Sequence, residues 1–223
     1  MRTKDKFTLL RSVRLLWERM FGEPSVAATF TCYRISTRAL RRAGTLRAMR
    51  TLVLDPSTAG LDGLLQRRSR SGLDRLDEVW AGVLHMIPAP SLAHALIAQQ
   101  LAELMGPLAR AAGLHSAMHE FNLGDSEDFR VPDGALHRPG AAGTWLSTAA
   151  VVVEIVSPED ESWEKLPFYA AHNVDEVVIV DPAERKVHWL ELARGEYRDV
   201  RRSSLIDLGP DELSGQIDWP SSD

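Results

Sequence analysis

The sequence predicts an α/β domain with a central mixed β-sheet flanked by helices. Two valine-rich runs, residues 149–156 and 175–181, are typical of strands buried on both faces of a sheet. The segment between them begins with Ser-Pro and acidic residues, a pattern that favours a helix. Upstream, a β-hairpin at residues 77–87 precedes a long amphipathic repeat at 92–112.

Length and composition indicate one globular domain with an extension. The 223 residues are 44% hydrophobic and 26% charged, as is usual for a chain that folds in water. The single cysteine, Cys32, excludes an internal disulfide framework and a cysteine zinc site, and it fits a reducing compartment. No apolar run approaches the roughly 20 residues that span a bilayer. We therefore expect a cytoplasmic protein with no membrane partner.

Charge divides the chain into two parts. Residues 1–50 hold 12 Lys/Arg and 3 Asp/Glu, and the remainder holds 14 basic and 28 acidic residues. We interpret residues 1–48 as a basic, weakly ordered extension, with a basic nucleic-acid arm as the alternative, and residues 49–223 as the folded domain. An acidic body does not bind phosphate backbones indiscriminately, so nucleic acid would meet a local basic patch or a bound metal.

The hairpin and the long helix are predicted from spacing. Residues 77–80 and 83–87 flank a two-residue turn, in which Gly82 can take a positive φ. Ser91 is a good N-cap for the helix over 92–112, whose first turn carries His94. A short amphipathic helix is expected earlier, at 61–68, and the basic cluster Arg67-Arg68-Ser-Arg70 at its end is interpreted as a solvated helix end.

Two further strands are expected before the first valine-rich run, at residues 115–122 and 128–136. The second contains Pro132-Asp133. A proline within a strand implies an edge, a bulge or a strand end, and a bulge can aim the next side chain, here Asp133, into a site.

The valine-rich run at 149–156 contains a carboxylate, Glu154. A buried carboxylate alone costs several kcal/mol, so Glu154 needs a cation, either a metal ion or an ammonium group. The following helix, expected to start at Ser157-Pro158 and to be kinked by Pro167, would carry Lys165 about two turns in and back over the end of the strand.

The C-terminal part continues the sheet. Residues 186–192 are expected to pair with 175–181 as an antiparallel hairpin, and 197–202 to add a last strand. Asp175 and Asp181 flank a strand and are interpreted as turn residues. A short helix or tail follows from residue 207.

Asp133 and Glu154 on neighbouring strands would offer two oxygen ligands to one Mg²⁺ ion, which is usually held by one or two carboxylates, waters and phosphate oxygens. A metal-bound water is a better nucleophile, and Lys165 beside it could orient it and stabilise developing negative charge. These are the minimum groups for metal-dependent phosphodiester hydrolysis. The alternatives are a buried structural ion pair between Glu154 and Lys165, and a turn-capping role for Asp133.

The order of these motifs resembles the Uma-two family of endonucleases, within the PD-(D/E)XK, restriction-endonuclease-like superfamily. The resemblance covers about residues 74–200. It is carried by these segments: Glu78-Val-Trp-Ala-Gly82, Pro88-Ala-Pro-Ser91 with His94, Pro132-Asp133, Val152-Val-Glu-Ile-Val-Ser-Pro158, Glu164-Lys-Leu-Pro-Phe-Tyr169 and Val174-Asp-Glu-Val-Val-Ile-Val-Asp-Pro182.

The resemblance implies a restriction-endonuclease-like fold, Asp133 and Glu154 as ligands of Mg²⁺ or Mn²⁺, and Lys165 as the catalytic lysine. It also implies supporting roles for Glu78 and His94, although surface decoration of the hairpin and packing at the helix start are the alternatives. In the superfamily the lysine usually lies two residues after the acid, where this chain has Val156.

The implied activity is metal-dependent hydrolysis of phosphodiester bonds in DNA, without an organic cofactor and with a homodimer as the form that cuts both strands. The alternative is a catalytically inactive nuclease fold that serves as a scaffold or binds a protein or nucleic acid. The acidic body and its few basic clusters favour this alternative.

Overall fold

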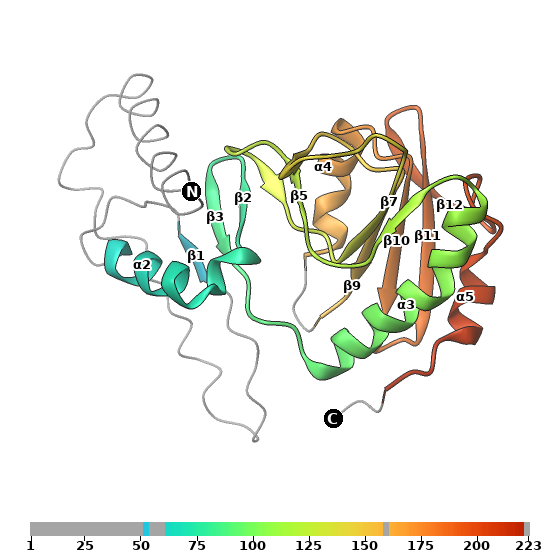
Figure 1. Cartoon of the computed structure of the whole chain (residues 1–223), viewed down its shortest axis with the longest axis horizontal. Coiled ribbons are helices and arrows are strands. Elements are labelled where there is room, and N and C mark those ends of the chain that lie inside the picture. The colour runs from blue at the N-terminus through green and yellow to red at the C-terminus, as the bar shows by residue number, and fades with distance from the viewer. Residues whose placement is uncertain (1–50, 54–60, 158–160, 221–223) are drawn as a thin grey trace.

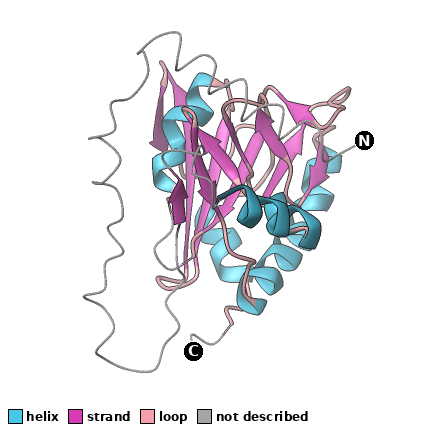
Figure 2. Cartoon of the chain, turned by 90° about the vertical axis from the view of Figure 1, so that its left-hand side faces the viewer, coloured by secondary structure: helices cyan, strands magenta, loops and turns pink. Residues whose placement is uncertain are grey.

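The computed structural model describes residues 51–53, 61–157 and 161–220. The expected extension, residues 1–48, lies outside these ranges. Figure 2 shows the strands gathered in the middle of the molecule with helices around them. None of the described helices has the length and apolar character needed to cross a membrane. The α/β class and the mixed sheet predicted from the sequence are confirmed, with two sheets instead of one.

The larger body of the fold is a six-stranded sheet that contains both valine-rich runs. Its strand order is β12-β11-β10-β9-β7-β4. The central pair, β9 and β10, is parallel, and the other neighbours are antiparallel. The strand bounds are β4 His115–Ala117, β7 Gly134–His137, β9 Val151–Ile155, β10 Glu176–Asp181, β11 Lys186–Ala193 and β12 Glu196–Asp199.

Helices cover both faces of this sheet (Figure 1). The helices α3 (Leu92–Ala111) and α5 (Pro210–Gln216) pack on one face, against side chains that include Val151, Val153 and Trp189. The short helix α4 (Leu166–Ala171) packs on the other face, against Val152 and Ile179. Because side chains alternate along a strand, successive residues of β9 reach these two different cores.

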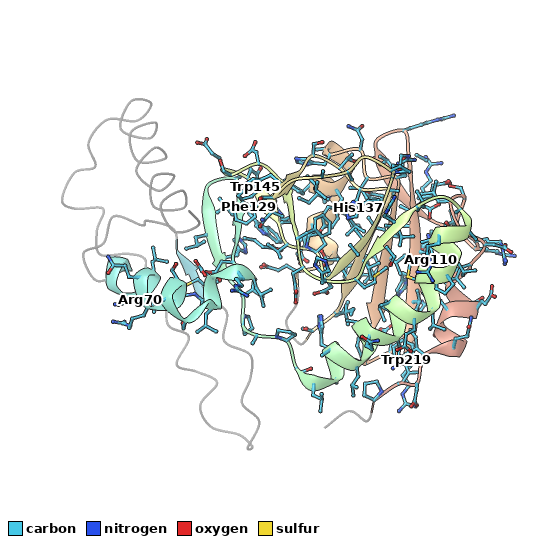
Figure 3. The ribbon with its side chains drawn as sticks, viewed as in Figure 1. Arg70, Arg110, Phe129, His137, Trp145 and Trp219 are labelled. Carbon is cyan, nitrogen blue, oxygen red and sulfur yellow. The ribbon has the colours of Figure 1, made fainter. Side chains whose placement is uncertain are left out.

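A second six-stranded sheet, with strand order β1-β3-β2-β6-β5-β8, lies on the side of α4. Its β2 and β3 form the predicted hairpin, and Ala81 and Gly82 both have positive φ, as a tight hairpin turn requires. Phe129 and Trp145 pack edge to face within it, 4.9 Å apart (Figure 3). The bounds are β1 Thr51–Val53, β2 Glu78–Trp80, β3 Val83–Met86, β5 Asn122–Gly124, β6 Phe129–Arg130 and β8 Trp145–Leu146.

Two strand predictions were wrong in the same way. The expected strands 115–122 and 128–136 are each divided, into β4 and β5 and into β6 and β7. The chain crosses from one sheet to the other at both breaks. Pro132 has no N–H for a sheet ladder, and Gly134 lies so close to Met118 that a Cβ atom would approach the methionine sulfur to 2.7 Å. The break leaves Asp133 directly before the first residue of β7.

The helix expected after Ser157 also differs. A 3₁₀ turn, η4 (Trp163–Lys165), leads directly into α4, and Pro167 lies in the first turn of α4 and does not kink a longer helix. A proline fits there because the first N–H groups of a helix have no partner within it. Lys165 therefore lies at the junction of η4 and α4, and not two turns into a helix. The expected start at Pro158 falls outside the described residues.

The remaining elements agree in type with the sequence analysis, although β12 ends at Asp199 and not at residue 202, and Arg68, expected at a solvated helix end, pairs with the buried Asp77. The helix α2 (Leu61–Ser71) is followed by a 3₁₀ turn, η3 (Leu73–Arg75). The hydroxyl of Ser91 accepts a hydrogen bond from the His94 amide at 3.1 Å, which confirms Ser91 as the N-cap of α3. Asp181 accepts hydrogen bonds from the two amides that follow Pro182 and is thus a turn residue, as predicted.

Candidate active site

Glu154 lies on the central strand β9, between β7 and β10. Its neighbours Val153 and Ile155 pack toward α3, so Glu154 faces α4 on the opposite side of the sheet. The side chain is only 3% exposed. The prediction of a carboxylate buried within a central strand is therefore confirmed, and the structure shows which groups neutralise it.

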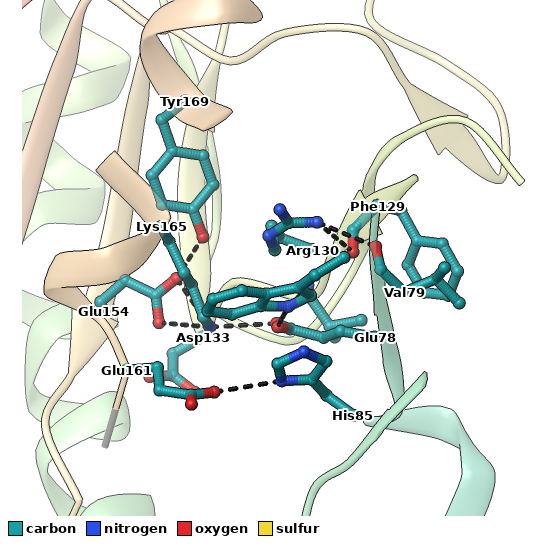
Figure 4. A network of polar contacts seen from close by, with 12 residues as sticks. Glu78, Val79, His85, Phe129, Arg130, Asp133, Glu154, Glu161, Lys165 and Tyr169 are labelled. Atoms are coloured by element: carbon teal, nitrogen blue, oxygen red, sulfur yellow. Dashed lines mark hydrogen bonds and ion pairs between the residues drawn. The ribbon is translucent and has the colours of Figure 1, made fainter. Parts of the chain in front are cut away.

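The ammonium of Lys165 is the direct partner of Glu154. Its Nζ atom lies 3.1 Å from each carboxylate oxygen. The described chain leaves β9 at Ile155 and returns at η4, so that Lys165 lies over the carboxylate (Figure 4). The structure thus brings together the two residues predicted to meet, with an ion pair that is almost fully buried.

Tyr169 is a third member of this group, and no role was predicted for it from the sequence. It follows Lys165 by one helical turn on α4, so both side chains reach the same region. Its hydroxyl donates a short hydrogen bond to Oε1 of Glu154, and the side chain is fully buried. The spacing of four residues in Lys-Leu-Pro-Phe-Tyr was the signal that could have identified it.

Asp133 lies next to Glu154 because of the strand register. Gly134 pairs with Val153 in the antiparallel β7–β9 ladder, so one step further places Asp133 opposite Glu154. Oδ2 of Asp133 accepts a hydrogen bond from the Ile155 amide at 2.7 Å. The Asp133 side chain accepts this hydrogen bond at the point where the β7 ladder ends. It is 20% exposed, so Asp133 lies nearer to solvent than Glu154 does.

His94 holds the other oxygen of Asp133. From the first turn of α3, its Nε2 atom lies 3.0 Å from Oδ1 of Asp133, and its Nδ1 atom lies 3.5 Å from the hydroxyl of Ser157. The imidazole therefore links the loop before β7 to the residues just after β9. The structure places His94 beside the predicted site, where it contacts one of the two candidate ligands.

Glu78 is buried, so the alternative that it decorates the hairpin surface was wrong. The side chain is 1% exposed, and its Oε1 atom lies 3.0 Å from Nζ of Lys165. The same oxygen accepts a hydrogen bond from the Val131 amide at 2.8 Å, and Oε2 accepts one from the Trp80 indole at 2.6 Å. The hairpin thus supplies a second carboxylate to the ammonium, from the other sheet (Figure 4).

Aromatic and cationic side chains pack around Trp80, whose indole bonds to Glu78. The Trp80 ring stacks on His85 with ring centroids 4.3 Å apart, and the Arg130 guanidinium lies 4.4 Å from the centroid of the Trp80 ring. Arg130 also lies 4.0 Å from the centroid of the Phe168 ring of α4. His85 in turn lies 3.1 Å from a carboxylate oxygen of Glu161. These contacts join the hairpin to α4, and no sequence pattern indicated them.

The site carries more negative than positive groups. Burial, the largest cause, raises the pKa of Glu154 together with the charges of Asp133 and Glu78, whereas Lys165 and the Tyr169 hydroxyl lower it, and the net pKa is about 8. Burial alone would lower the pKa of Lys165, but Glu154, Glu78 and Asp133 outweigh it and raise this pKa above its ordinary value. Burial and the nearby Glu154 also raise the pKa of Tyr169. Lys165 is therefore charged, and the carboxylates exceed the cations available to them.

These residues fit the ligand set expected for Mg²⁺ or Mn²⁺. Among the described residues, no three His, Cys, Asp or Glu side chains gather into a group that could hold a metal ion by themselves. Asp133 and Glu154 provide two carboxylates in register, and Mg²⁺ is commonly held by one or two carboxylates with water and substrate oxygens. The excess of carboxylates over ammonium groups at this position favours a bound cation.

The chain is similar to known proteins in sequence and in fold. Residues 71–216 match the Uma2 family model, described as "Putative restriction endonuclease". In solved structures, the chain is similar to a crystal structure titled as a putative nuclease of DUF820 from Anabaena variabilis, with a TM-score of 0.51 and 16% identity over 63% of this chain and 90% of that one. No curated protein matches the chain. The family match extends over well more than half of the sequence, and this chain therefore belongs to the Uma2 family of restriction-endonuclease-like proteins.

Proposed function

We propose that this protein is a divalent-metal-dependent endonuclease that hydrolyses phosphodiester bonds in DNA. The observation that carries the proposal is the buried pair of Glu154 and Lys165 with Asp133 beside it. Asp133 lies in register with Glu154, whose carboxylate pairs with the Lys165 ammonium at 3.1 Å. Family membership supports the same reaction class.

Each residue has a role that follows from its surroundings. Asp133 and Glu154 would hold Mg²⁺ or Mn²⁺, which when bound lowers the pKa of a water and neutralises developing charge. Lys165 places a fixed positive charge beside the carboxylates, where it can stabilise negative charge on a phosphoryl oxygen. Tyr169 holds Glu154 in one orientation. His94 does the same for Asp133.

A cleavage assay tests the proposal. Purified protein is incubated with supercoiled plasmid, linear duplex, single-stranded DNA and RNA, with Mg²⁺, Mn²⁺ or EDTA. We expect metal-dependent cleavage of DNA that is lost in Glu154→Gln and kept in Glu164→Gln, a matched change at an exposed residue beside Lys165. Equal cleavage by both variants would contradict the assigned site, and cleavage of RNA alone would contradict the assigned substrate.

A second candidate is a scaffold that keeps the fold without catalysis. The observation that favours it is the ion pair itself, because Lys165 neutralises Glu154 without any other cation. Calorimetric titration with Mn²⁺ separates the two functions. Binding that Asp133→Asn weakens supports the endonuclease, whereas absence of Mn²⁺ binding supports the scaffold.

A further inference from the structure

The Lys165 ammonium has two carboxylate partners that come from different sheets. Both oxygens of Glu154, on β9, lie 3.1 Å from Nζ, and Oε1 of Glu78, on β2, lies 3.0 Å from it. The Glu78 carboxylate is itself fixed by the Val131 amide and the Trp80 indole. Glu78 is thus a rigid acceptor whose position does not depend on Glu154.

The ammonium also competes for the carboxylate proposed to bind metal. It contacts both oxygens of Glu154, and Tyr169 contacts one of them as well. Any other cation that binds Glu154 must displace the Lys165 ammonium from the oxygen lone pairs of this carboxylate. Three carboxyl groups, those of Glu154, Glu78 and Asp133, thus lie near a single ammonium, that of Lys165.

A charged lysine this deeply buried needs a counter-ion at all times. If another cation binds Glu154, the Lys165 ammonium still has a counter-ion only if a second carboxylate is already held in contact with it. Glu78 meets this condition, since Lys165 contacts it without moving. The carboxylate oxygens of Glu78 and of Asp133 all have partners, but Glu78 is 1% exposed and Asp133 is 20% exposed, so Asp133 is the more accessible ligand for a metal ion.

We propose that Glu78 is a positioning residue that retains the Lys165 ammonium when a divalent cation binds Glu154 and Asp133. Lys165 then gives up its contact with Glu154, keeps its contact with Glu78 and stays at the site as a fixed positive charge. The inference rests on the proposed function and adds a defined role for the hairpin, which is to supply the second counter-ion.

A double-mutant cycle on Mn²⁺ affinity tests this exchange without measuring cleavage. The full-length wild type, Glu78→Gln, Lys165→Met and the double variant are titrated by calorimetry, with Glu164→Gln as the control. Glu78→Gln should weaken Mn²⁺ binding by roughly 10-fold, as is common for residues behind a metal ligand. Lys165→Met should tighten it by about 10-fold or more, because a competing charge is removed.

The double variant decides the question. If Glu78 acts through Lys165, then Glu78→Gln has no further effect in the Lys165→Met background, and the two changes are not additive. Equal weakening in both backgrounds would make Glu78 a direct ligand and overturn the inference, although wild-type DNA cleavage would still support the endonuclease. If none of these proteins binds Mn²⁺, both this inference and the proposed function are overturned. Thermal unfolding monitors folding, and Lys165→Gln replaces Lys165→Met if the latter does not fold.

Discussion

Glu154 and Glu176 lie on neighbouring strands of the central sheet, and both are buried, but their surroundings differ. Glu154 faces α4 and has a cation, a tyrosine hydroxyl and two further carboxylates near it. Glu176 is fully buried and bonds to the indole of Trp189 and to the hydroxyls of Ser203 and Ser204, at 2.6 to 2.8 Å. The Ser204 amide is a further donor, at 2.7 Å.

The difference separates a structural carboxylate from a candidate catalytic one. The donors that bond to Glu176 are neutral groups, so its charge is spread over hydrogen bonds that hold the segment after β12 against β10. Glu154 has other acids near it, which a purely structural site would avoid because like charges repel. Burial alone therefore does not distinguish the two carboxylates, whereas the excess of acids around Glu154 makes it the candidate for a functional one.

The largest expected effect is a difference in DNA cleavage between two variants that carry the same isosteric change, one at Glu154 and one at Glu176. Glu154→Gln should reduce DNA cleavage by about 100-fold or more, because it removes the charge that would hold the metal. Glu176→Gln should leave the rate per folded molecule unchanged, since it faces the opposite side of the sheet. Initial rates of plasmid cleavage, normalised to folded protein by circular dichroism, check this. A large rate loss in Glu176→Gln would remove the distinction.

Stability should respond in the reverse order. In Glu176→Gln, an amide NH₂ replaces an oxygen that accepts from N–H and O–H donors, and buried groups left unpaired cost about 1–3 kcal/mol. We therefore expect a loss of about 2 kcal/mol in the free energy of unfolding. Urea denaturation measures it, with the exposed Glu196→Gln as the control. If both variants unfold at the same urea concentration, Glu176 does not hold the fold.

Tyr169→Phe should give an intermediate effect. The Glu154 carboxylate loses the hydroxyl that orients it, and we expect cleavage and Mn²⁺ affinity to fall by roughly 10-fold. Tyr197→Phe is the matched control, because its hydroxyl donates to the Val174 carbonyl at 2.8 Å and not to Glu154. Its removal should affect stability only. Equal activity losses in the two variants would point to a general effect on folding.

The last prediction concerns a pH dependence of stability in the absence of metal. The pKa of Glu154 is about 8 in the folded chain and near 4.5 otherwise. Between these values the folded state binds the extra proton, so this carboxyl stabilises the fold at low pH and loses that contribution as pH rises toward 8. Lys165 is charged in both states over this window and contributes no slope.

Glu154→Gln lacks this titration. Its free energy of unfolding, measured in EDTA, should therefore rise relative to the wild type as pH increases from 5 to 8, by an amount on the order of 1 kcal/mol or more. Parallel curves for the two proteins would show that Glu154 keeps an ordinary pKa. Subtracting the curves cancels other groups, including His137, whose pKa is lowered by burial and by the nearby His119 and His115.

Local patterns predicted much of the frame. The valine-rich runs, the Ala-Gly turn and the Ser91 cap each depend on neighbours within a few residues, so β9, β10, the hairpin and α3 could be located from the sequence. The divided strands could not, because a crossing between sheets depends on what lies beside it. Gly134 packs closely against Met118, and no pattern in the sequence indicates that these two segments lie side by side.

By itself, the sequence determined that a carboxylate is buried in a central strand and that a lysine follows it closely enough to return. The same pattern, an acid in a valine-rich strand, also describes Glu176. Only the tertiary structure showed how their surroundings differ, because it placed Glu78 and Asp133 beside Glu154 and neutral donors around Glu176. The energy of a buried charge depends on every group within a few ångströms, and most of those groups come from distant parts of the chain.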